Sequence, residues 1–358
     1  MTAGSSMASA SPQPLVSVVV PIYNGAEVVA DTLRSVLGQT HQNLEVIAVD
    51  DGSTDRTVQL IEEEFGGDER VRLVTQVNQG VAAARNAGLA EANGPLIAFV
   101  DSDDVWHQEK LAKQVALLER AGPDVGVVYT WYANIDRAGV IVPPLRPKPM
   151  HRGNVLAPLL LQNFVGNAST PLIRTSLLKR VGGYSRDLLE KSGGQGFEDW
   201  HLYLKLAEVC EFEVVAEFLT GYRQGRATMS RDVKPFLSNF HAARQDIWSR
   251  HPDLPRPLHL WSEIYLLAWM ASRAWTLGQR ITALGLLVRG AGTVIRNDPL
   301  LPFRPATRKF VRYALELRKH EGETADDRPY LGSVPVVDAN AWRQTLELRS
   351  TFVDEIIR

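Results

Sequence analysis

The sequence predicts an α/β fold: a mostly parallel sheet flanked by helices, with a C-terminal α-helical extension. Over roughly the first 130 residues, short apolar runs bounded by turn residues alternate with segments whose apolar residues recur at helical spacing. Strands and helices that alternate in this way build parallel sheets covered on both faces. The alternation then stops, and beyond residue 230 the composition changes and favours helices.

The expected strands are the apolar runs at residues 16–21, 44–49, 71–75, 96–100 and 125–130. Runs of this length are typical of strands that are buried on both faces. The first helix has Val29, Leu33 and Val36 on one face and stops at Gly38. A second helix starts after the N-cap residues 53–55, and two more are expected at residues 81–92 and 107–121.

The second half of the chain is less regular. A hairpin is expected at residues 129–142, then a proline-rich loop, and then mixed helices and turns up to residue 217. Residues 258–296 predict two helices that form an αα-hairpin, and residues 339–358 predict a last amphipathic helix after a polar linker at 321–338. We therefore divide the chain into a disordered lead (1–14), an α/β domain (15–230) and a helical region (231–358).

Composition limits the function classes. With 358 residues, 45% of them hydrophobic, the chain can bury a full core, and its net charge of −2 predicts no nucleic-acid partner. The single cysteine, Cys210, excludes an internal disulfide framework and is typical of a reducing cytoplasm. No apolar run reaches the roughly 18 residues of a membrane helix. We expect a cytoplasmic protein that is soluble or peripheral on the inner face of the cell membrane.

Acidic residues gather in three clusters along the chain: Asp50 with Asp51, then Asp101 with Asp103 and Asp104, then Glu198 with Asp199. The first two clusters follow expected strands, and open α/β sheets bind ligands at the carboxyl ends of their strands. Three neighbouring carboxylates repel one another unless a cation or several donors offset their charge. The simplest explanation is a divalent metal ion that in turn holds phosphate.

These clusters and the segments VSVVVPIYNGAEVVADTLRSVLGQT, NQGVAAARNAGL and GFEDWHLYLKLA resemble glycosyltransferase family 2, whose catalytic domain has the GT-A fold. The resemblance covers roughly the first two-thirds of the chain. It implies an inverting glycosyltransferase that moves a sugar from a nucleotide donor, most commonly UDP, to a saccharide or lipid-linked acceptor. Cell-surface polysaccharide synthesis is the expected setting.

By this resemblance Asp101 and Asp103 form a DxD pair that holds Mn²⁺ or Mg²⁺, and Asp103 is the direct ligand. Asp101 also belongs to the nucleotide site, while Asp104 ligates the metal or contacts the donor. A metal held by these carboxylates would bridge two phosphate oxygens as a Lewis acid. The alternative is that one of these acids caps the helix that begins after Trp106.

The resemblance also implies a nucleotide-binding pocket. Its expected lining residues are Pro21, Tyr23, Asn24, Asp50, Asp51 and Arg85. The matching acids of the family accept hydrogen bonds from the nucleotide base, and Asp51 is the preferred candidate. DDGST is also good turn chemistry, so a purely structural role stays open for both acids. Arg85 stands among alanines that would let its helix approach a ligand closely.

The third cluster predicts the catalytic base. The family's ED motif assigns proton removal from the acceptor hydroxyl to Asp199, with Glu198 holding the acceptor or neighbouring donors. Trp200 would stack on an acceptor sugar, although core packing is the alternative. The chain departs from many relatives in YRQGRATMS, where Gly225 replaces a histidine that can bind the metal. Arg223 or Arg226 would then offset the diphosphate charge.

Two other functions share parts of this pattern. A non-catalytic member that binds a nucleotide-sugar or scaffolds an assembly stays open, although the intact Asp103 and Asp199 favour an enzyme. A phosphatase of the haloacid dehalogenase kind needs its DxD on the first strand, which here ends in Pro-Ile-Tyr-Asn. The tryptophan-rich C-terminal helices are expected to dock an acceptor, the membrane edge or a second subunit in a homo-oligomer.

Overall fold

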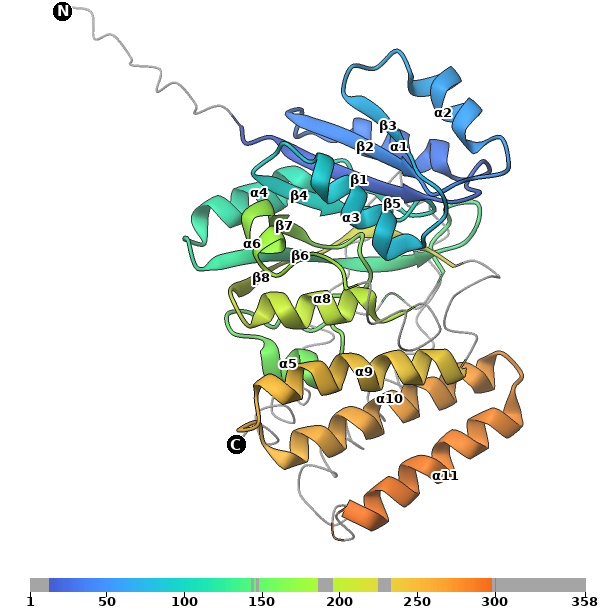
Figure 1. The fold of residues 1–358 in the computed structure, drawn as a ribbon, viewed down its shortest axis with the longest axis vertical. Helices are drawn as coiled ribbons and strands as arrows, with labels where there is room; N and C mark the ends of the chain where they lie inside the picture. The colour runs from blue at the N-terminus through green and yellow to red at the C-terminus, as the bar shows by residue number, and fades with distance from the viewer. Residues whose placement is uncertain are drawn as a thin grey trace, which may run out of the picture.

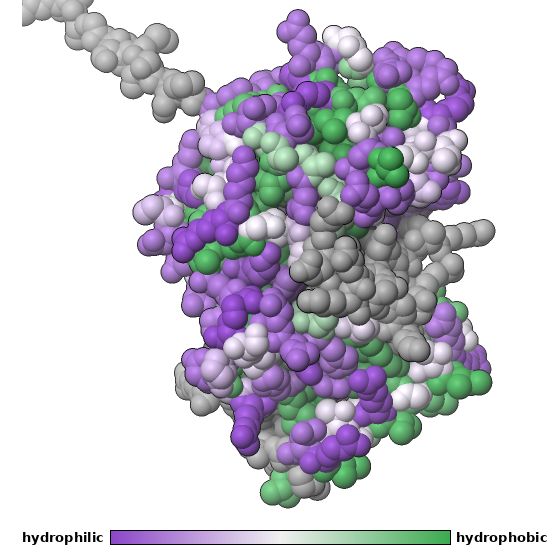
Figure 2. Space-filling model, in the orientation of Figure 1, coloured by the Kyte–Doolittle hydropathy of each residue, from purple (hydrophilic) through white to green (hydrophobic). Residues whose placement is uncertain are grey.

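The computed structural model describes residues 13–142, 145, 148–185, 196–224, 233–297 and 300. Figure 1 shows a sheet with helices on both faces in one half of the molecule and a layer of long helices in the other. On the face drawn in Figure 2, hydrophilic side chains cover most of the sheet half, and hydrophobic ones gather at the lower end over the long helices. The expected α/β fold with a C-terminal helical extension is confirmed.

Eight strands of the described chain form one sheet in the order β3-β2-β1-β4-β7-β6-β8-β5. Their bounds are β1 Val16–Ile22, β2 Leu44–Asp50, β3 Val71–Thr75, β4 Leu96–Phe99, β5 Val105–Trp106, β6 Val125–Ile135, β7 Leu172–Arg174 and β8 Glu211–Arg223. The strands β3, β2, β1 and β4 are mutually parallel, as the sequence predicts. β7 runs antiparallel to both β4 and β6, whereas β6 and β8 are parallel.

The helices cover both faces of this sheet. Their bounds are α1 Val29–Leu37, α2 Thr57–Phe65, α3 Val81–Glu91, α4 Lys110–Arg120, α5 Leu156–Leu161, α6 Thr175–Arg180, α8 Glu198–Ala207, α9 Val233–Arg250, α10 Arg256–Thr276 and α11 Arg280–Asn297. Alternate residues of β1 enter different cores: Val18 and Val20 pack with α1 and α4, whereas Val19 packs with α3 and α8. A strand buried on both faces therefore reads as a continuous apolar run.

Helix α3 approaches the sheet closely because the residues that face the sheet are small. A Cβ atom on Gly88 would lie 2.2 Å from the side chain of Val19 in β1, so no larger residue fits there. Ala82 and Ala84 are fully buried on the same helix. This close approach brings Arg85, at the start of α3, over the carboxyl ends of the strands.

The structure corrects several expected elements. The helix expected from residue 107 begins at Lys110, because Val105–Trp106 forms the short strand β5 against β8. The last expected strand extends to Ile135, and the hairpin after it is reduced to a turn closed by the bridge between Ile135 and Ile141. The αα-hairpin is confirmed as α10 and α11, whereas α9 was not predicted.

The sheet and the C-terminal helices share buried apolar contacts, since one hydrophobic cluster runs from β1 through α8 to α10 and α11. Among the described residues, no helix is long and apolar enough to cross a membrane. Residues 1–12, the linker at 321–338 and the helix expected at 339–358 lie outside the described residues, so those predictions and the domain boundaries stay predictions.

Candidate active site

A cleft of about 1480 Å³ opens where β1, β2 and β4 end. It lies between the sheet, the start of α8 and the helices α9 and α10, all of which contribute lining residues. The three acidic clusters of the sequence converge here, since Asp51, Asp101, Asp103, Glu198 and Asp199 all line it. Carboxylates separated by more than a hundred residues in the chain therefore share one site.

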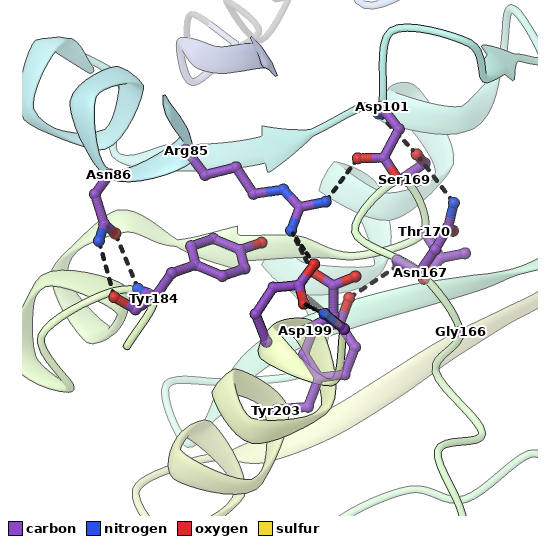
Figure 3. Close-up of polar contacts among 12 residues, drawn as sticks. Arg85, Asn86, Asp101, Gly166, Asn167, Ser169, Thr170, Tyr184, Asp199 and Tyr203 are labelled. Carbon is purple, nitrogen blue, oxygen red and sulfur yellow. Dashed lines mark hydrogen bonds and ion pairs between the residues drawn. The ribbon is translucent and has the colours of Figure 1, made fainter. Parts of the chain in front are cut away.

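Arg85 joins two of these clusters (Figure 3). Its Nη2 lies 2.7 Å from Oδ1 of Asp101, and its Nη1 lies 2.8 Å from Oδ1 of Asp199 and 3.2 Å from Oε1 of Glu198. The Arg85 side chain is 1% exposed, and its guanidinium also lies 5.0 Å from the ring centre of Tyr184. The sequence predicted an arginine in the nucleotide pocket; the structure places it as the buried cation between the DxD and ED segments.

The environment of Asp199 suits a proton acceptor. Burial raises the pKa of Asp199 well above its ordinary value, Arg85 lowers it, and the charges of Glu198 and Asp101 raise it again. A carboxylate with a raised pKa is a stronger base when it is ionised, and the best catalytic base has a pKa near the working pH. The neighbouring guanidinium keeps the ionised form accessible in this buried position.

The start of α8 holds the ED pair in an unusual backbone conformation. Phe197, the N-cap residue, has a φ of 67°, and Gly196 before it has a φ of 112°. A non-glycine residue rarely adopts the left-handed conformation unless its surroundings hold it there. Here the centre of the Phe197 ring lies 4.2 Å from the centre of the Phe236 ring in α9. Glu198 accepts a hydrogen bond of 3.0 Å from the Gly196 backbone, so it stabilises this turn as well as pairing with Arg85.

Within the DxD segment the structure separates three neighbouring acids. Asp104 is fully buried: its Oδ2 accepts hydrogen bonds from Ser169 (2.6 Å) and Asn167 (2.5 Å), and its Oδ1 accepts one from the Arg223 backbone (3.0 Å). Burial raises the pKa of Asp104. Both oxygens are occupied by protein donors, so the prediction that Asp104 ligates the metal or contacts the donor does not fit this structure, and its role is to hold the loop.

Asp101 and Asp103 are left facing the cleft, and their chemistry fits a hard divalent cation. Burial, followed by the charge of Asp101, raises the pKa of Asp103 to about 6, whereas the charge of Arg223 lowers it. In the described part of the chain no cluster of three or more acidic, histidine or cysteine ligands is assembled. Mg²⁺ commonly takes only one or two carboxylates and completes its shell with phosphate and water, so this pair suffices.

The nucleotide end of the cleft distinguishes the two adjacent acids at the end of β2. Asp51 lines the cleft and organises the loop before α3, because it accepts hydrogen bonds from the backbones of Gln79 (2.9 Å) and Gly80 (2.8 Å). Asp50 instead accepts from the Ser53 backbone at 3.2 Å and does not line the cleft. Asp50 thus has the turn role that sequence chemistry left open.

The first strand-end motif also lies at this end. Pro21, Tyr23 and Asn24 all line the cleft, and the Tyr23 ring is half exposed. Asn24 has a φ of 50°, and its side chain accepts a hydrogen bond of 2.8 Å from the Thr54 backbone. The two strand-end loops therefore brace each other and present an exposed aromatic ring toward the ligand space.

Arg223, expected to offset diphosphate charge, is used differently. Its side chain is 5% exposed, and its guanidinium donates to the backbone carbonyl of Asp103 at 2.8 Å and to those of Asp136 and Arg137. It therefore fastens β8 to the DxD loop. Gly225 and Arg226 lie outside the described residues.

The aromatic side chains of the acceptor side also differ from expectation. Trp200 is 2% exposed, donates from Nε1 to the Leu159 carbonyl at 2.7 Å and stacks on Phe240, so it packs beneath the cleft wall. The exposed ring on that wall belongs to Trp269 of α10, which stacks on Phe236. The sequence analysis did not assign Trp269 to the site; the only indication was the concentration of tryptophans in this helix.

Comparison with known proteins agrees with this geometry. Residues 17–182 match the family model for glycosyl transferase family 2. Over 111 residues the chain is 45% identical to the putative teichuronic acid biosynthesis glycosyltransferase TuaG of Bacillus subtilis, covering 30% of this chain and 44% of TuaG. Over 202 residues it is 30% identical to the chondroitin synthase of Escherichia coli, covering 56% of this chain and 27% of the synthase. The chain thus spans less than half the length of these relatives.

The fold has solved counterparts. The structure of S. aureus TarS 1–349 superimposes with a TM-score of 0.55 at 18% identity, covering 94% of this chain and 91% of that one. The same protein in complex with UDP-GlcNAc gives a TM-score of 0.50, with coverage of 95% and 89%. The fold is therefore the GT-A fold of these structures. Over residues 17–182, the chain is similar to glycosyl transferase family 2.

Proposed function

We propose that the protein is an inverting, metal-assisted glycosyltransferase that moves a sugar from a UDP-sugar to a saccharide or lipid-linked acceptor of a cell-surface polysaccharide. One observation carries this proposal. A single buried arginine, Arg85, pairs with Asp101 of the DxD segment and with Asp199 of the ED segment. The carboxylate of the donor side and the carboxylate of the acceptor side are thereby held at one fixed place, which is what a direct transfer between two bound substrates requires.

The donor half of the proposal rests on the strand ends. Asp51 and the exposed ring of Tyr23 lie at the nucleotide end of the cleft, and Asp101 with Asp103 would hold Mn²⁺ or Mg²⁺ beside the diphosphate. When bound, the metal neutralises the negative charge that develops on the leaving UDP. UDP is favoured among nucleotides because TarS, which shares the fold, forms a complex with UDP-GlcNAc.

In the reaction itself, Asp199 accepts the proton of the acceptor hydroxyl while that oxygen attacks the anomeric carbon. A bond forms between the acceptor oxygen and the anomeric carbon, and the bond from that carbon to the diphosphate oxygen breaks. Attack comes from the face opposite the leaving group, so the configuration inverts. Arg85 keeps the Asp199 carboxylate oriented at 2.8 Å and favours its ionised form.

The acceptor half rests on the wall formed by α9 and α10. Phe236, Tyr265, Trp269 and Arg273 line the cleft on the side of Asp199. The Trp269 ring is 42% exposed and is backed by Phe236, with ring centres 5.8 Å apart. A rigid exposed ring at this position gives a sugar a flat apolar surface to stack on at little entropic cost.

Release of UDP from UDP-sugars tests the proposal. Water can replace the acceptor, so wild-type protein with Mn²⁺ is expected to hydrolyse at least one member of a UDP-sugar panel slowly. Asp199→Asn is expected to lower that rate by about 10² to 10⁴, and its unchanged thermal shift with UDP would show an intact donor site. Nucleotide binding without any UDP release, with or without saccharides, would favour a non-catalytic nucleotide-sugar-binding protein instead.

A further inference from the structure

Exposed apolar side chains are concentrated at one end of the molecule. Eight of the thirteen large apolar side chains that are exposed in the described part of the chain lie between residues 275 and 300: Trp275, Leu277, Ile281, Leu284, Leu287, Val288, Ile295 and Leu300. Figure 2 shows hydrophobic atoms along the lower end of the face drawn, where Figure 1 places α10 and α11. Scattered exposed apolar residues are normal, but a contiguous group marks an interaction surface.

Five of these residues form a stripe along α11. Ile281, Leu284, Leu287, Val288 and Ile295 recur at three- and four-residue spacing, which puts them on one face of the helix. The opposite face is buried against the protein through Ala283 and Leu286. We call this stripe, together with Trp275 at the end of α10, the α11 face. The helix is therefore apolar on both sides, although only one side has a partner in the described structure.

Charge distinguishes what could cover the α11 face. Helix α11 contains three arginines, Arg280, Arg289 and Arg296, and no acidic residue. Arg289 pairs with Glu263 of α10 at 3.6 Å, and the positive charge of α11 contrasts with a net charge of −2 for the whole chain. An apolar helical face combined with a local excess of positive charge is the pattern of helices that lie in the interface of anionic bilayers.

The aromatic residue at the edge of this face fits the same environment. Trp275 is 55% exposed, and the guanidinium of Arg280 lies 5.7 Å from its ring centre. A tryptophan beside an arginine suits the headgroup level of a membrane, where an apolar ring and a cation are both accommodated. We propose that the α11 face binds the surface of an anionic phospholipid bilayer.

Two other partners are less well matched. In a symmetric contact between two copies the arginines of α11 would approach those of the second copy, and like charges brought together oppose association. The chain's own amphipathic segment at 339–358 carries three basic and three acidic residues, so it offers no net negative charge to complement the arginines of α11. An anionic lipid surface supplies both the apolar layer and the opposite charge.

Binding through the α11 face would also fix the position of the cleft relative to the bilayer. Helix α10 packs on α11, where Gly290 lies against Leu267, and the same helix presents Leu266 and Trp269 to the cleft. The α11 face and the proposed acceptor wall thus belong to neighbouring helices, α11 and α10. The axes of two helices packed in this way lie about 8–10 Å apart. The membrane proposal itself depends only on the α11 face and not on the proposed function.

Vesicle co-sedimentation of the full chain tests the proposal. Wild-type protein is expected to sediment with vesicles of phosphatidylglycerol and phosphatidylcholine in equal parts, to remain in the supernatant with pure phosphatidylcholine, and to be released by high salt. Ile281→Glu combined with Val288→Glu is expected to weaken binding roughly tenfold or more, because each change puts an anion into the apolar stripe. Both residues are exposed, so the fold should tolerate the change.

Val77→Glu is the matched control, since Val77 is as exposed as Val288 (82% and 71%) but lies in the loop before α3. It is expected to bind vesicles like wild type. The proposal is overturned if wild-type protein ignores anionic vesicles, if it binds both vesicle types equally, or if the double variant binds as well as wild type. A double variant that misfolds by circular dichroism is replaced by Ile295→Glu, with the same expectations. Loss of a dimer without any vesicle binding would instead identify the face as a contact between copies.

Discussion

Replacing Arg85 by methionine tests the geometry of the site most severely. The methionine keeps most of the side-chain volume, but it leaves Glu198, Asp199 and Asp101 without the cation that pairs with all three. Arg85 and Glu198 are both almost fully buried. Removing one partner of a buried ion pair destabilises a protein by about 3–5 kcal/mol, because the remaining charge is buried without compensation. We expect Arg85→Met to lower the free energy of unfolding by this amount at pH 7.

The loss should depend on pH in a defined direction. Burial already raises the pKa of Asp199, and removing Arg85, which lowers it, raises that pKa further. A carboxyl whose folded pKa lies above its unfolded value of about 3.9 destabilises the fold above that pH and not below it. The difference in unfolding free energy between Arg85→Met and wild type should therefore shrink as the pH falls from 7 toward 4.

Urea unfolding at several pH values measures both effects. Arg72→Met is the matched control, because Arg72 pairs with Glu91 at 2.7 Å but is 43% exposed. Surface ion pairs contribute only about 0–1 kcal/mol, so this variant should stay close to wild type at every pH. A loss for Arg85→Met no larger than that of Arg72→Met, or one that does not change with pH, would refute the buried ion-pair network.

Three further predictions concern the ligands. UDP should raise the melting temperature more with Mn²⁺ or Mg²⁺ than with EDTA, and at 100 times its dissociation constant it should add about 2.7 kcal/mol to the free energy of unfolding. Asp103→Ala should remove the metal dependence, and a shift that EDTA does not change would count against the metal role. Asp104→Asn should lower stability by about 1–3 kcal/mol, because an amide cannot accept its three hydrogen bonds, while the metal dependence of UDP binding persists; loss of that dependence would restore Asp104 as a ligand. Trp269→Ala should raise the KM for the acceptor without changing the UDP shift. Met150→Ala, at a similarly exposed side chain (47% against 42%) outside the cleft lining, should leave both unchanged, and equal effects of the two variants in assays of transfer would argue against an acceptor wall on α10.

The parallel half of the sheet was predictable because its pattern is local. Each of β1 to β4 is a short apolar run, the first three are each followed directly by a helix, and the structure pairs all four in parallel as expected. The antiparallel additions were not predictable in the same way. β5 and β7 have two and three residues, which is too few for a periodic pattern. They form because they pair with strands distant in the sequence: β5 pairs with β8, and β7 pairs with β4 and β6.

The candidate site shows the same division. Motif resemblance located the acids, but their individual roles depend on contacts across long stretches of chain. Asp104 and Asp103 are adjacent in sequence, yet Ser169, Asn167 and the Arg223 backbone fill the oxygens of Asp104 only. Arg85 likewise meets Asp199 from 114 positions away. No local pattern carries such pairings, so the sequence alone left them open.

The stereochemistry of the released sugar tests the proposed mechanism most directly, and it needs no knowledge of the acceptor. In proton NMR spectra recorded during hydrolysis of a UDP-sugar with an α linkage, the β anomer should appear first and then equilibrate slowly with the α form. Asp199→Asn should slow this release while leaving the anomer unchanged. First appearance of the α anomer would contradict a single displacement with Asp199 as its base.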